Sequence, residues 1–478
     1  MKKYFAAIVV FTLFTSCYHA HPIVTLKNAQ KIPERTLFVA LDGVDFALID
    51  ELCREGHFKD FLPPLKFTST FPSDTTLGFT GIFQPLGAGR VPGYEVRFYS
   101  YQKNKIEGGT PFDIYKIEIP YKDYFDAFRH RMREKATMYM LPGVAGKEDL
   151  VRTEKILYKS DKKILMNYLG GTDGAAHILG RARAKHFLIY ADQFLHNMVT
   201  RYEKERHEKL RVVLFSDHGF YYQAPKTVTN KSLQARLGAK GFQLTSRVTS
   251  DRDVVVVPFG LLSAGILFTP VTHRAEMAQA IAGAAGVDLV FWHSDKRDKV
   301  FMKGHDGSAA YFEYAGSKRY RYVSVTGDPL GYNAVLQRHG LAPQTWLNDA
   351  TWQKLTYDDK YPDAGYRLYD SFFNLVENPA SILFSMEPGY QFGSLLARLG
   401  TYAKFGHKGT HGGLFRETTQ GIILTNTQPD KALPKFMRYN EMFPYFLTPV
   451  TTAYPATKLP EEVSVILTPE QRQKLPNR

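Results

Sequence analysis

Three apolar runs along the chain each end at an acidic residue that is followed by loop-forming residues. The run TLFVAL ends at Asp42, KILMNYLGG is followed by Thr172 and Asp173, and RVVLFS ends at Asp217. Because these runs are continuously apolar and do not alternate with polar residues, they predict strands that are covered on both faces. Such strands are typical of a parallel sheet with helices on each side, so the pattern predicts an α/β fold.

The segment between the second and third runs predicts a connecting helix. Apolar residues recur at helical spacing within residues 181–207, while Arg, Lys and Glu fill the other faces: Phe187, Ala191, Phe194 and Met198. A strand, this helix and the next strand make a βαβ unit. Ligand sites in open α/β sheets lie beyond the carboxyl ends of the strands, so we expect the three strand-end carboxylates to meet in one crevice.

The later part of the chain is longer than one crossover connection requires. The stretch between His218 and His411 contains an alanine-rich helical segment at residues 275–285 and the β-like segment SAAYFEYAGSKRYRYVSV. We therefore predict a catalytic α/β core made of residues 30–225 and 400–450. Residues 226–399 are predicted to be an insertion or an elaborated part of the core, and 451–478 a C-terminal tail.

The first residues have the pattern of an export signal. Two lysines precede an apolar stretch at residues 4–14, and a Thr-Ser pair leads to Cys17. This stretch is shorter than the roughly 20 residues that span a bilayer. The cysteine after the small pair resembles a bacterial lipoprotein signal, in which the cysteine is lipidated. Residues 1–17 therefore predict a lipoprotein of the periplasm or outer membrane, with ordinary secretion and a retained anchor as the alternatives.

Composition excludes several classes of protein. Of the 478 residues, 44% are hydrophobic and 14% aromatic, so the chain can bury a large core and does not fit a disordered protein. The two cysteines, Cys17 and Cys53, allow at most one disulfide, which excludes a disulfide-stabilised miniprotein. The 61 basic and 47 acidic residues give a net charge of +14. This charge indicates an anionic partner, such as nucleic acid, an anionic membrane or a phosphorylated small molecule.

Four short motifs supply residues that bind metal ions. They contain three carboxylates and three imidazoles, a mixture typical of the ligands of Zn²⁺: Asp42, Asp173, His177, Asp217, His218 and His411. Each residue alone is more often a helix cap or a packed core residue, so only the set carries the prediction. Asp173 and His177 are four residues apart and share one face if they lie on a helix. Because six ligands exceed the four that one tetrahedral zinc accepts, the set predicts two divalent ions.

A separate motif, FPSDTT followed by LGFTGIF, predicts a loop that enters a helix, with Thr75 or Thr76 at the first turn. The amides and the positive end of the dipole at a helix N-terminus favour an alkoxide and can hold a phosphate oxygen. A nearby dication lowers the pKa of the hydroxyl further. Taken alone, residues 73–76 are capping residues. Together with the metal motifs they predict a catalytic nucleophile, with Thr75 favoured over Thr76.

Along the chain the motifs follow the order metal Asp, nucleophilic Thr, D-x-x-x-H, D-H-G and G-x-H-G. This order resembles that of the type I phosphodiesterase/nucleotide pyrophosphatase group of the alkaline phosphatase superfamily. The resemblance implies an alkaline-phosphatase-like α/β/α sandwich with a central, mostly parallel sheet. It implies that Thr75 forms a covalent phosphothreonine intermediate. It also implies two zinc sites with these ligands: Asp42, Asp217 and His218 at one, and Asp173, His177 and His411 at the other.

The function that the resemblance implies is metal-dependent hydrolysis of small phosphate esters by a phosphodiesterase, nucleotide pyrophosphatase or phosphatase. A phosphotransferase or mutase with the same site is an alternative, and a non-catalytic envelope lipoprotein is another. Sulfatases of the superfamily need C-x-P-x-R, and the candidate that begins at Cys53 lacks the proline, which argues against a sulfatase. A basic protein that attracts small phosphate esters needs no nucleic-acid partner. Membrane attachment is expected only through the lipid anchor.

Overall fold

The structure is a computed structural model that describes most of the chain between residues 35 and 447. The described ranges are 35–95, 97–108, 120–126, 128, 137–138, 140–257, 260–316, 318–393, 406–429 and 431–447. The predicted export signal at 1–17 and the predicted tail at 451–478 lie outside them. Within these ranges, none of the helices combines the length and the hydrophobicity that a membrane-spanning segment requires.

The lower half of the molecule is built on a five-stranded sheet. Its strands are β1 (Arg35–Leu41), β2 (Leu65–Thr68), β5 (Ile164–Leu169), β6 (Leu210–Phe215) and β19 (Gln420–Thr425). Their spatial order is β2-β19-β6-β1-β5. β1 pairs in parallel with β5 and β6, whereas β19 is antiparallel to both β6 and β2, so four of the five strands run in one direction. The predicted α/β fold with a mostly parallel central sheet is confirmed.

The central strands of this sheet are buried on both faces. Every residue of β1, β5 and β6 is buried. Along β1, Leu37 and Val39 pack into one hydrophobic cluster, while Phe38 and Ala40 pack into another on the opposite face. This double burial explains why the three runs are continuously apolar in the sequence.

Helices cover both faces of the sheet. The cluster around Leu37 includes residues of four helices: α1 (Phe46–Arg54), α4 (Pro142–Lys159), α5 (Gly171–Leu179) and α6 (Arg181–Arg206). The opposite cluster includes residues of α2 (Thr75–Phe83) and of the 3₁₀ turns η5 (Tyr439–Glu441) and η6 (Phe443–Tyr445). α5 (Gly171–Leu179) directly precedes α6, which is the helix predicted within residues 181–207.

The upper half contains a nine-stranded sheet formed within residues 243–386. Its strands are β8 (Gln243–Thr245), β9 (Asp253–Val256), β11 (Ala264–Phe268), β12 (Val287–His293), β13 (Lys299–Gly304), β14 (Ala309–Tyr314), β15 (Arg319–Thr326), β16 (Leu347–Asn348) and β17 (Ile382–Met386). Their order is β16-β15-β14-β13-β12-β17-β11-β9-β8. β8 and β9 pair in parallel, and the other neighbours are antiparallel.

Smaller elements complete the described structure. A three-stranded sheet contains β7 (Lys226–Thr229), β10 (Leu261–Leu262) and β18 (Tyr390–Gly393). A hairpin is formed by β3 (Phe98–Ser100) and β4 (Lys105–Glu107). The remaining helices are α7 (Asn230–Gly238), α8 (Arg274–Ala282), α9 (Tyr332–Arg338), α10 (Asp349–Thr356), α11 (Ala364–Phe373) and α13 (Arg416–Thr419). Three 3₁₀ turns are η1 (Gln84–Leu86), η3 (Pro120–Tyr124) and η4 (Val271–His273). The predicted alanine-rich helix corresponds to α8.

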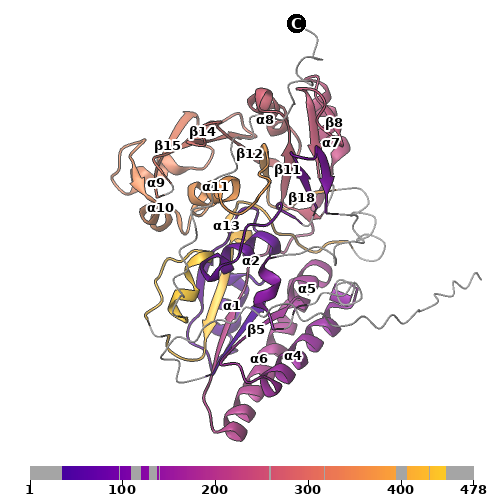
Figure 1. The fold of residues 1–478 in the computed structure, drawn as a ribbon. Coiled ribbons are helices and arrows are strands. Elements are labelled where there is room, and N and C mark those ends of the chain that lie inside the picture. The colour runs from indigo at the N-terminus through magenta and orange to yellow at the C-terminus, as the bar shows by residue number, and fades with distance from the viewer. Residues whose placement is uncertain are drawn as a thin grey trace, which may run out of the picture.

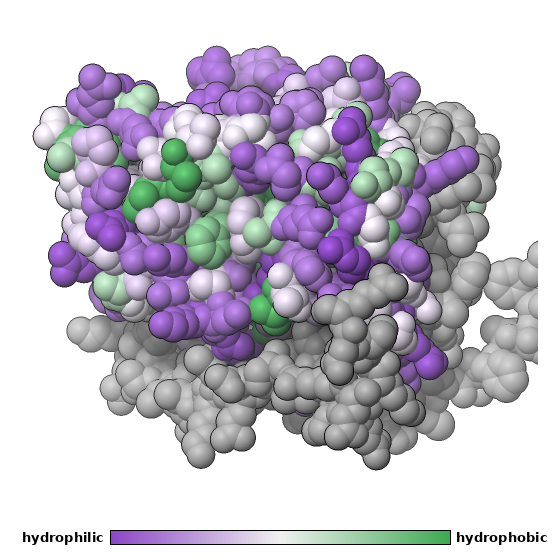
Figure 2. Space-filling model, turned by 90° about the horizontal axis from the view of Figure 1, so that it is seen from above, coloured by the Kyte–Doolittle hydropathy of each residue, from purple (hydrophilic) through white to green (hydrophobic). Residues whose placement is uncertain are grey.

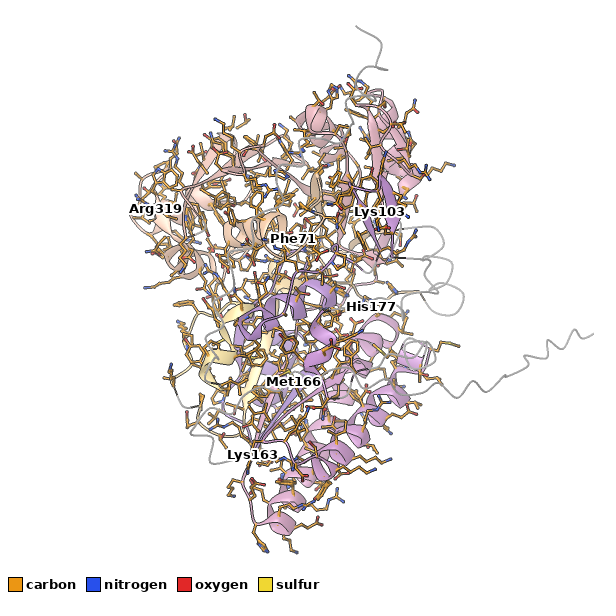
Figure 3. The ribbon with its side chains drawn as sticks, viewed as in Figure 1. Phe71, Lys103, Lys163, Met166, His177 and Arg319 are labelled. Atoms are coloured by element: carbon orange, nitrogen blue, oxygen red, sulfur yellow. The ribbon has the colours of Figure 1, made fainter. Side chains whose placement is uncertain are left out.

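The two halves are stacked, with the carboxyl ends of the parallel strands facing the upper half, whose main part lies within residues 226–399 and is called the insertion below. In Figure 1 the core with β5, α4 and α6 lies below the strands β12, β14 and β15, and α2, α11 and α13 lie at the junction. Figure 3 labels Lys163, Met166 and His177 in ascending order, so β5 runs toward the junction. Seen from above, the outer face of the insertion is mostly hydrophilic with small, separate hydrophobic groups (Figure 2). A ligand that binds at the strand ends therefore lies between the two halves.

Candidate active site

The structure brings the six candidate ligands together at the carboxyl end of the core sheet. Asp42 directly follows β1, Asp173 lies in the first turn of α5 after β5, and Asp217 lies two residues beyond β6. His411 belongs to the segment that precedes α13. All six side chains are buried: Asp42, Asp173, His177, Asp217, His218 and His411.

One group of ligand atoms consists of Asp42, Asp217 and His218, whose atoms lie within 4.8 Å of one another. His218 Nε2 lies 3.4 Å from Asp217 Oδ2 and 3.7 Å from Asp42 Oδ1. The Gly43 amide donates a hydrogen bond of 3.1 Å to the other oxygen of Asp217. Gly43 has a φ of 64°, and a Cβ there would lie 2.9 Å from Asp173 Oδ1, so the tight turn after β1 requires glycine.

A second group consists of Asp173, His218 and His411. His411 Nε2 lies 3.7 Å from Asp173 Oδ1, and the rings of His218 and His411 stack with centroids 4.0 Å apart. This group contains His218 where the sequence resemblance implied His177. His177 remains adjacent, because its Nε2 lies 3.3 Å from Asp173 Oδ1 on the same face of α5. The two groups therefore share His218 and form one continuous buried cluster.

The three imidazoles are oriented in the same way. The Nδ1 atoms of His177, His218 and His411 lie 3.1, 2.9 and 3.0 Å from the main-chain oxygens of Gly409, Gly219 and Ser73, respectively. A carbonyl oxygen only accepts hydrogen bonds, so each Nδ1 carries a proton and each Nε2 is the ring nitrogen left to bind a metal ion. Metal-binding histidines in proteins typically donate their second nitrogen to a carbonyl or carboxylate in this way.

The electrostatics of the cluster favour a bound cation. The pKa of Asp42 is raised well above its usual value, because burial disfavours the carboxylate and because Asp217 and Asp173 repel it. Burial also raises the pKa of Asp217, against the attraction of His218. Burial and the neighbouring His218 hold the pKa of His411 well below its usual value, so this imidazole is neutral. Buried carboxylates that repel one another beside a neutral imidazole are stabilised as ligands of a cation.

The distance between Asp217 and His218 fits coordination of one metal ion better than a direct hydrogen bond. Asp217 Oδ2 and His218 Nε2 are buried and make no hydrogen bond within the described ranges, although they lie only 3.4 Å apart. Zinc bonds of about 2.0–2.2 Å at tetrahedral angles place two ligand atoms roughly 3.3–3.6 Å apart. The spacing of these two atoms falls in that range, and that of Asp173 Oδ1 and His177 Nε2, 3.3 Å, lies at its lower end. The buried Asp and His groups could therefore hold metal ions.

Thr75 and Thr76 differ in their surroundings. Thr75 is the first residue of α2, which is capped by the Asp74 carboxylate accepting from the Leu77 amide at 3.1 Å. The Thr75 hydroxyl donates to Asp42 Oδ1 at 3.2 Å, so it touches the metal-ligand cluster. The Thr76 side chain instead hydrogen-bonds with the buried Tyr121. Of the two hydroxyls, only that of Thr75 is bonded to one of the six candidate ligands in the described structure.

Two further residues, Tyr168 and Gly78, support this arrangement. The hydroxyl of Tyr168, in β5, donates a short hydrogen bond to Asp42 Oδ2 and thereby fixes the carboxylate from the side opposite Thr75. Gly78 allows α2 to approach the core sheet, because a Cβ there would lie 2.9 Å from the carbonyl oxygen of Asp217. The sequence signal for Tyr168 was a tyrosine near the end of an apolar strand, two residues before the Gly-Gly pair.

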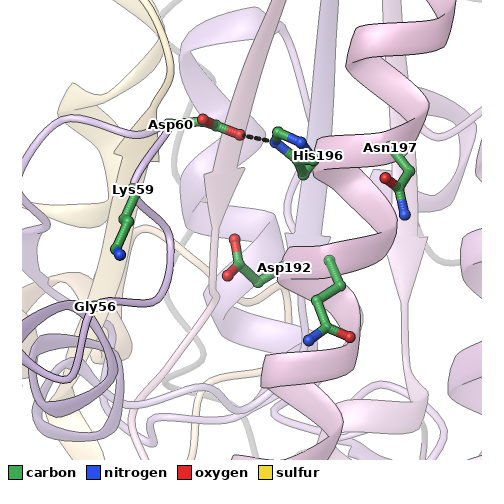
Figure 4. A pocket seen from close by; sticks show the side chains of 7 residues that line it. Gly56, Lys59, Asp60, Asp192, His196 and Asn197 are labelled. Atoms are coloured by element: carbon green, nitrogen blue, oxygen red, sulfur yellow. Dashed lines mark hydrogen bonds and ion pairs between the residues drawn. The ribbon is translucent and has the colours of Figure 1, made fainter.

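A surface groove lies elsewhere and contains none of these residues. It has a volume of about 370 Å³ and is lined by Gly56, Lys59, Asp60, Asp192, Gln193, His196 and Asn197. Figure 4 shows that the Asp60 carboxylate pairs with His196 of α6 across this groove, at 2.6 Å. Exposed pairs of this kind are common and contribute little to stability. The buried cluster at the strand ends is therefore the stronger candidate for chemistry.

Comparison with known proteins gives likenesses in structure only. No protein-family model matches this chain, and a search of curated proteins also finds no match. A phosphonoacetate hydrolase from Sinorhizobium meliloti 1021, in complex with phosphonoformate, is 13% identical, with a TM-score of 0.48 over 85% of this chain and 94% of its own. Human ectonucleotide pyrophosphatase/phosphodiesterase 5 is 10% identical, with a TM-score of 0.46 over 86% of this chain and 93% of its own.

The murine ectonucleotide pyrophosphatase/phosphodiesterase 5, in an inactive form in complex with AMP, is 11% identical to this chain. Its TM-score is 0.44 over 85% of this chain and 90% of its own. Two of the three names belong to the group that the sequence motifs resemble. At identities of 10–13%, these likenesses concern the course of the chain alone, and the activities in the names are those of the other proteins.

Proposed function

We propose that this protein is an enzyme that hydrolyses small phosphate esters. The buried cluster binds two divalent ions, and both are Zn²⁺. Thr75 is the nucleophile and forms a transient phosphothreonine. The proposal covers phosphodiesters, nucleotides and phosphomonoesters as substrates, because the described residues do not distinguish among them. The net charge of +14 supports the attraction of such anions.

The observation that carries the proposal is the contact between the Thr75 hydroxyl and the Asp42 carboxylate. Thr75 stands at the N-terminus of α2, where the helix dipole favours negative charge on an oxygen atom. Its hydroxyl lies 3.2 Å from Asp42 Oδ1, which is one of the ligand atoms of the first group. A half-buried hydroxyl that points into a cluster of carboxylates and imidazoles is placed to attack a phosphorus atom.

The residues of the chain then act in two displacement steps. Asp42 orients the Thr75 hydroxyl. Thr75 Oγ1 gives up its proton and attacks the phosphorus atom, while the bond to the leaving oxygen breaks and that oxygen takes up a proton from solvent. In the second step a water molecule attacks the same phosphorus, the bond to Thr75 Oγ1 breaks, and the threonine hydroxyl is regenerated. The bound ions, when present, neutralise the charge of the phosphoryl group and lower the pKa of coordinated hydroxyls.

Paired variants of the two threonines test the proposal. Thr75→Ala removes the hydroxyl that contacts Asp42, so we expect turnover to fall by at least about 10³-fold while both ions stay bound. Thr76→Ala is the matched control, because the Thr76 side chain bonds to Tyr121, and it should retain most of the activity. The measurement is a rate panel with aryl phosphate monoesters, diesters and nucleotides, together with the metal content of each protein.

Trapping the intermediate provides a second measurement. Acid quenching during turnover should leave phosphate on Thr75, as seen by mass spectrometry of the peptide, and none in the Thr75→Ala protein. Repeating the assay with an alcohol acceptor distinguishes hydrolysis from transfer of the phosphoryl group. Full activity in Thr75→Ala, or fewer than one bound transition ion per folded chain, would contradict the proposal.

A further inference from the structure

A buried arginine from the inserted segment contacts two of the segments that form the candidate site. Arg367 lies on α11 and is only 1% exposed. Its Nε donates to the Ser69 carbonyl at 2.8 Å and its Nη2 to the Thr70 carbonyl at 2.9 Å. Its Nη1 donates to the Leu414 carbonyl at 2.9 Å and to the Pro362 carbonyl at 3.2 Å. One guanidinium group thus joins three separate stretches of main chain.

Two of those stretches carry residues of the site. Ser69 and Thr70 follow β2 and lead to Thr75 at the start of α2. The Ser69 hydroxyl also donates to the main-chain oxygen of Asp217 at 2.5 Å, which ties the same stretch to the first ligand group. Leu414 lies three residues after His411. Arg367 therefore holds the segment that leads to the nucleophile against the segment that carries His411.

Other residues of the insertion contact the same His411 segment. The Ser263 amide donates to the His411 carbonyl at 2.7 Å. The Leu414 amide donates to the hydroxyl of Ser385, in β17, at 3.0 Å. The main chain at His411 and at Leu414, three residues later, is thus hydrogen-bonded to the insertion.

The orientation of His411 depends on the distance between the two segments. Its Nδ1 donates to the Ser73 carbonyl at 3.0 Å, and the Ser73 hydroxyl donates to the Gly413 carbonyl at 3.0 Å. Both bonds cross from one segment to the other. A shift of the His411 segment by a fraction of an ångström would lengthen them and turn the Nε2 atom away from Asp173.

We propose that Arg367, assisted by Ser385, is a positioning residue that sets His411 in place for the second metal position. The insertion then determines metal occupancy and does more than cover the core. This inference rests on the proposed function, because it assumes that the cluster binds two ions. The four contacts of Arg367 are hydrogen bonds to main-chain carbonyl oxygens. A planar guanidinium, with five N–H donors in fixed directions, is the side chain best suited to make them.

Substitution of Arg367 tests this inference through metal binding and not through turnover. In Arg367→Lys, a single ammonium with three rotatable donors replaces the fork and cannot reach all four carbonyls. We expect the affinity for the second Zn²⁺ to fall by about 10–100-fold, and the affinity for the first to change less than twofold. The measurement is stepwise competition between the full-length protein and a chromophoric zinc chelator. Ser385→Ala removes one acceptor and should weaken the second ion in the same direction, by roughly threefold or more.

Arg274→Lys is the matched control. Arg274 is another buried arginine of the insertion, and its Nη1 bonds to the His293 carbonyl at 3.2 Å and to Asp295 at 3.3 Å, away from the site. It should bind both ions as the wild type does. If Arg367→Lys and Ser385→Ala also bind the second ion with wild-type affinity, or if both ions weaken equally, the inference is wrong.

Two further outcomes are decided by the same measurement. If thermal unfolding shows that Arg367→Lys is not folded at the assay temperature, Ser385→Ala decides alone, and wild-type affinity for the second ion overturns the inference. A wild-type protein that binds fewer than two ions overturns the proposed two-ion site itself. If the wild type binds two ions and Arg367→Lys binds the second ion with wild-type affinity, only the role of Arg367 is overturned.

Discussion

The hydroxyl of Tyr168 provides a measurable test of how the first ligand group is held. Tyr168→Phe removes one oxygen atom and retains the aromatic ring, which packs against Phe79 and Phe128 with centroids 5.7 and 4.7 Å away. The lost contact is the short hydrogen bond to Asp42 Oδ2. That bond lowers the pKa of Asp42 and so favours the carboxylate that a metal ion requires, against the burial that raises it. Its loss should therefore weaken metal binding.

The size of the effect follows from the strength of such a bond. A hydrogen bond to a charged group contributes about 1.5–3 kcal/mol, and about 1.4 kcal/mol corresponds to a tenfold change in affinity. We therefore expect the ion held by Asp42 to bind about 10–100-fold more weakly in Tyr168→Phe, and most strongly so at low pH, where the carboxylate protonates first. The assay is competition with a zinc chelator at several pH values between 5.5 and 8.

Tyr361→Phe is the matched control for this experiment. Tyr361 is also a buried tyrosine whose hydroxyl donates to a carboxylate, that of Asp288 at 2.7 Å, but Asp288 belongs to the insertion and to neither ligand group. This variant should bind zinc as the wild type does. A Tyr168→Phe protein whose affinity lies within twofold of the wild type would refute the argument that the hydroxyl supports Asp42 as a ligand.

Two other predictions concern single positions. Gly78→Ala places a Cβ 2.9 Å from the Asp217 carbonyl oxygen, so we expect the free energy of unfolding to fall by about 1–3 kcal/mol and the first ion to bind more weakly. Gly89→Ala is the control in thermal unfolding, because a Cβ there meets nothing within 4 Å. Equal stabilities of the two variants would contradict the prediction. Burial, together with the charges of Asp50 and Asp192, raises the pKa of Cys53 to about 11. In a Cys17→Ser background, iodoacetamide at pH 8 should therefore alkylate Cys53 at least about 100-fold more slowly in the native protein than in the unfolded chain. Similar rates would show that the thiol is not protected.

The core of the fold could be predicted because its strands are buried on both faces. Continuous apolar runs before Asp42 and Asp217 mark β1 and β6, and the polar faces of residues 181–207 mark the amphipathic helix α6. The antiparallel strand β19 carries an equally apolar run, GIILT, but no sequence pattern distinguishes an antiparallel neighbour from a parallel one. Strand direction depends on where the chain returns after the insertion, which is a tertiary property.

The sequence named six candidate ligands that the structure brings together, and their division between two ions stays a prediction. The resemblance divided six residues into two sets of three, with Asp173, His177 and His411 in one set. In the structure His218 stacks on His411 and belongs to both groups, whereas His177 lies beside the second group, with its Nε2 3.3 Å from Asp173 Oδ1 and its ring centroid 5.1 Å from that of His411. The rotation of each imidazole is set by the carbonyl that its Nδ1 meets, such as Gly219 for His218. Those carbonyls come from loop geometry and have no signature in the sequence.

The residues that position the site are the hardest to find in a sequence, for a physical reason. Ligands and nucleophiles are recognised because few side chains can perform their chemistry. Arg367 bonds to main-chain carbonyls, which every residue supplies, so none of the residues 69, 70 or 414 had to be of a particular type to receive it. The only trace in the sequence is the arginine itself, on the amphipathic helix α11 far from every motif. Because such a guanidinium acts on two segments at once, a measurement of metal affinity detects it where motif spacing does not, and the insertion should be regarded as part of the site.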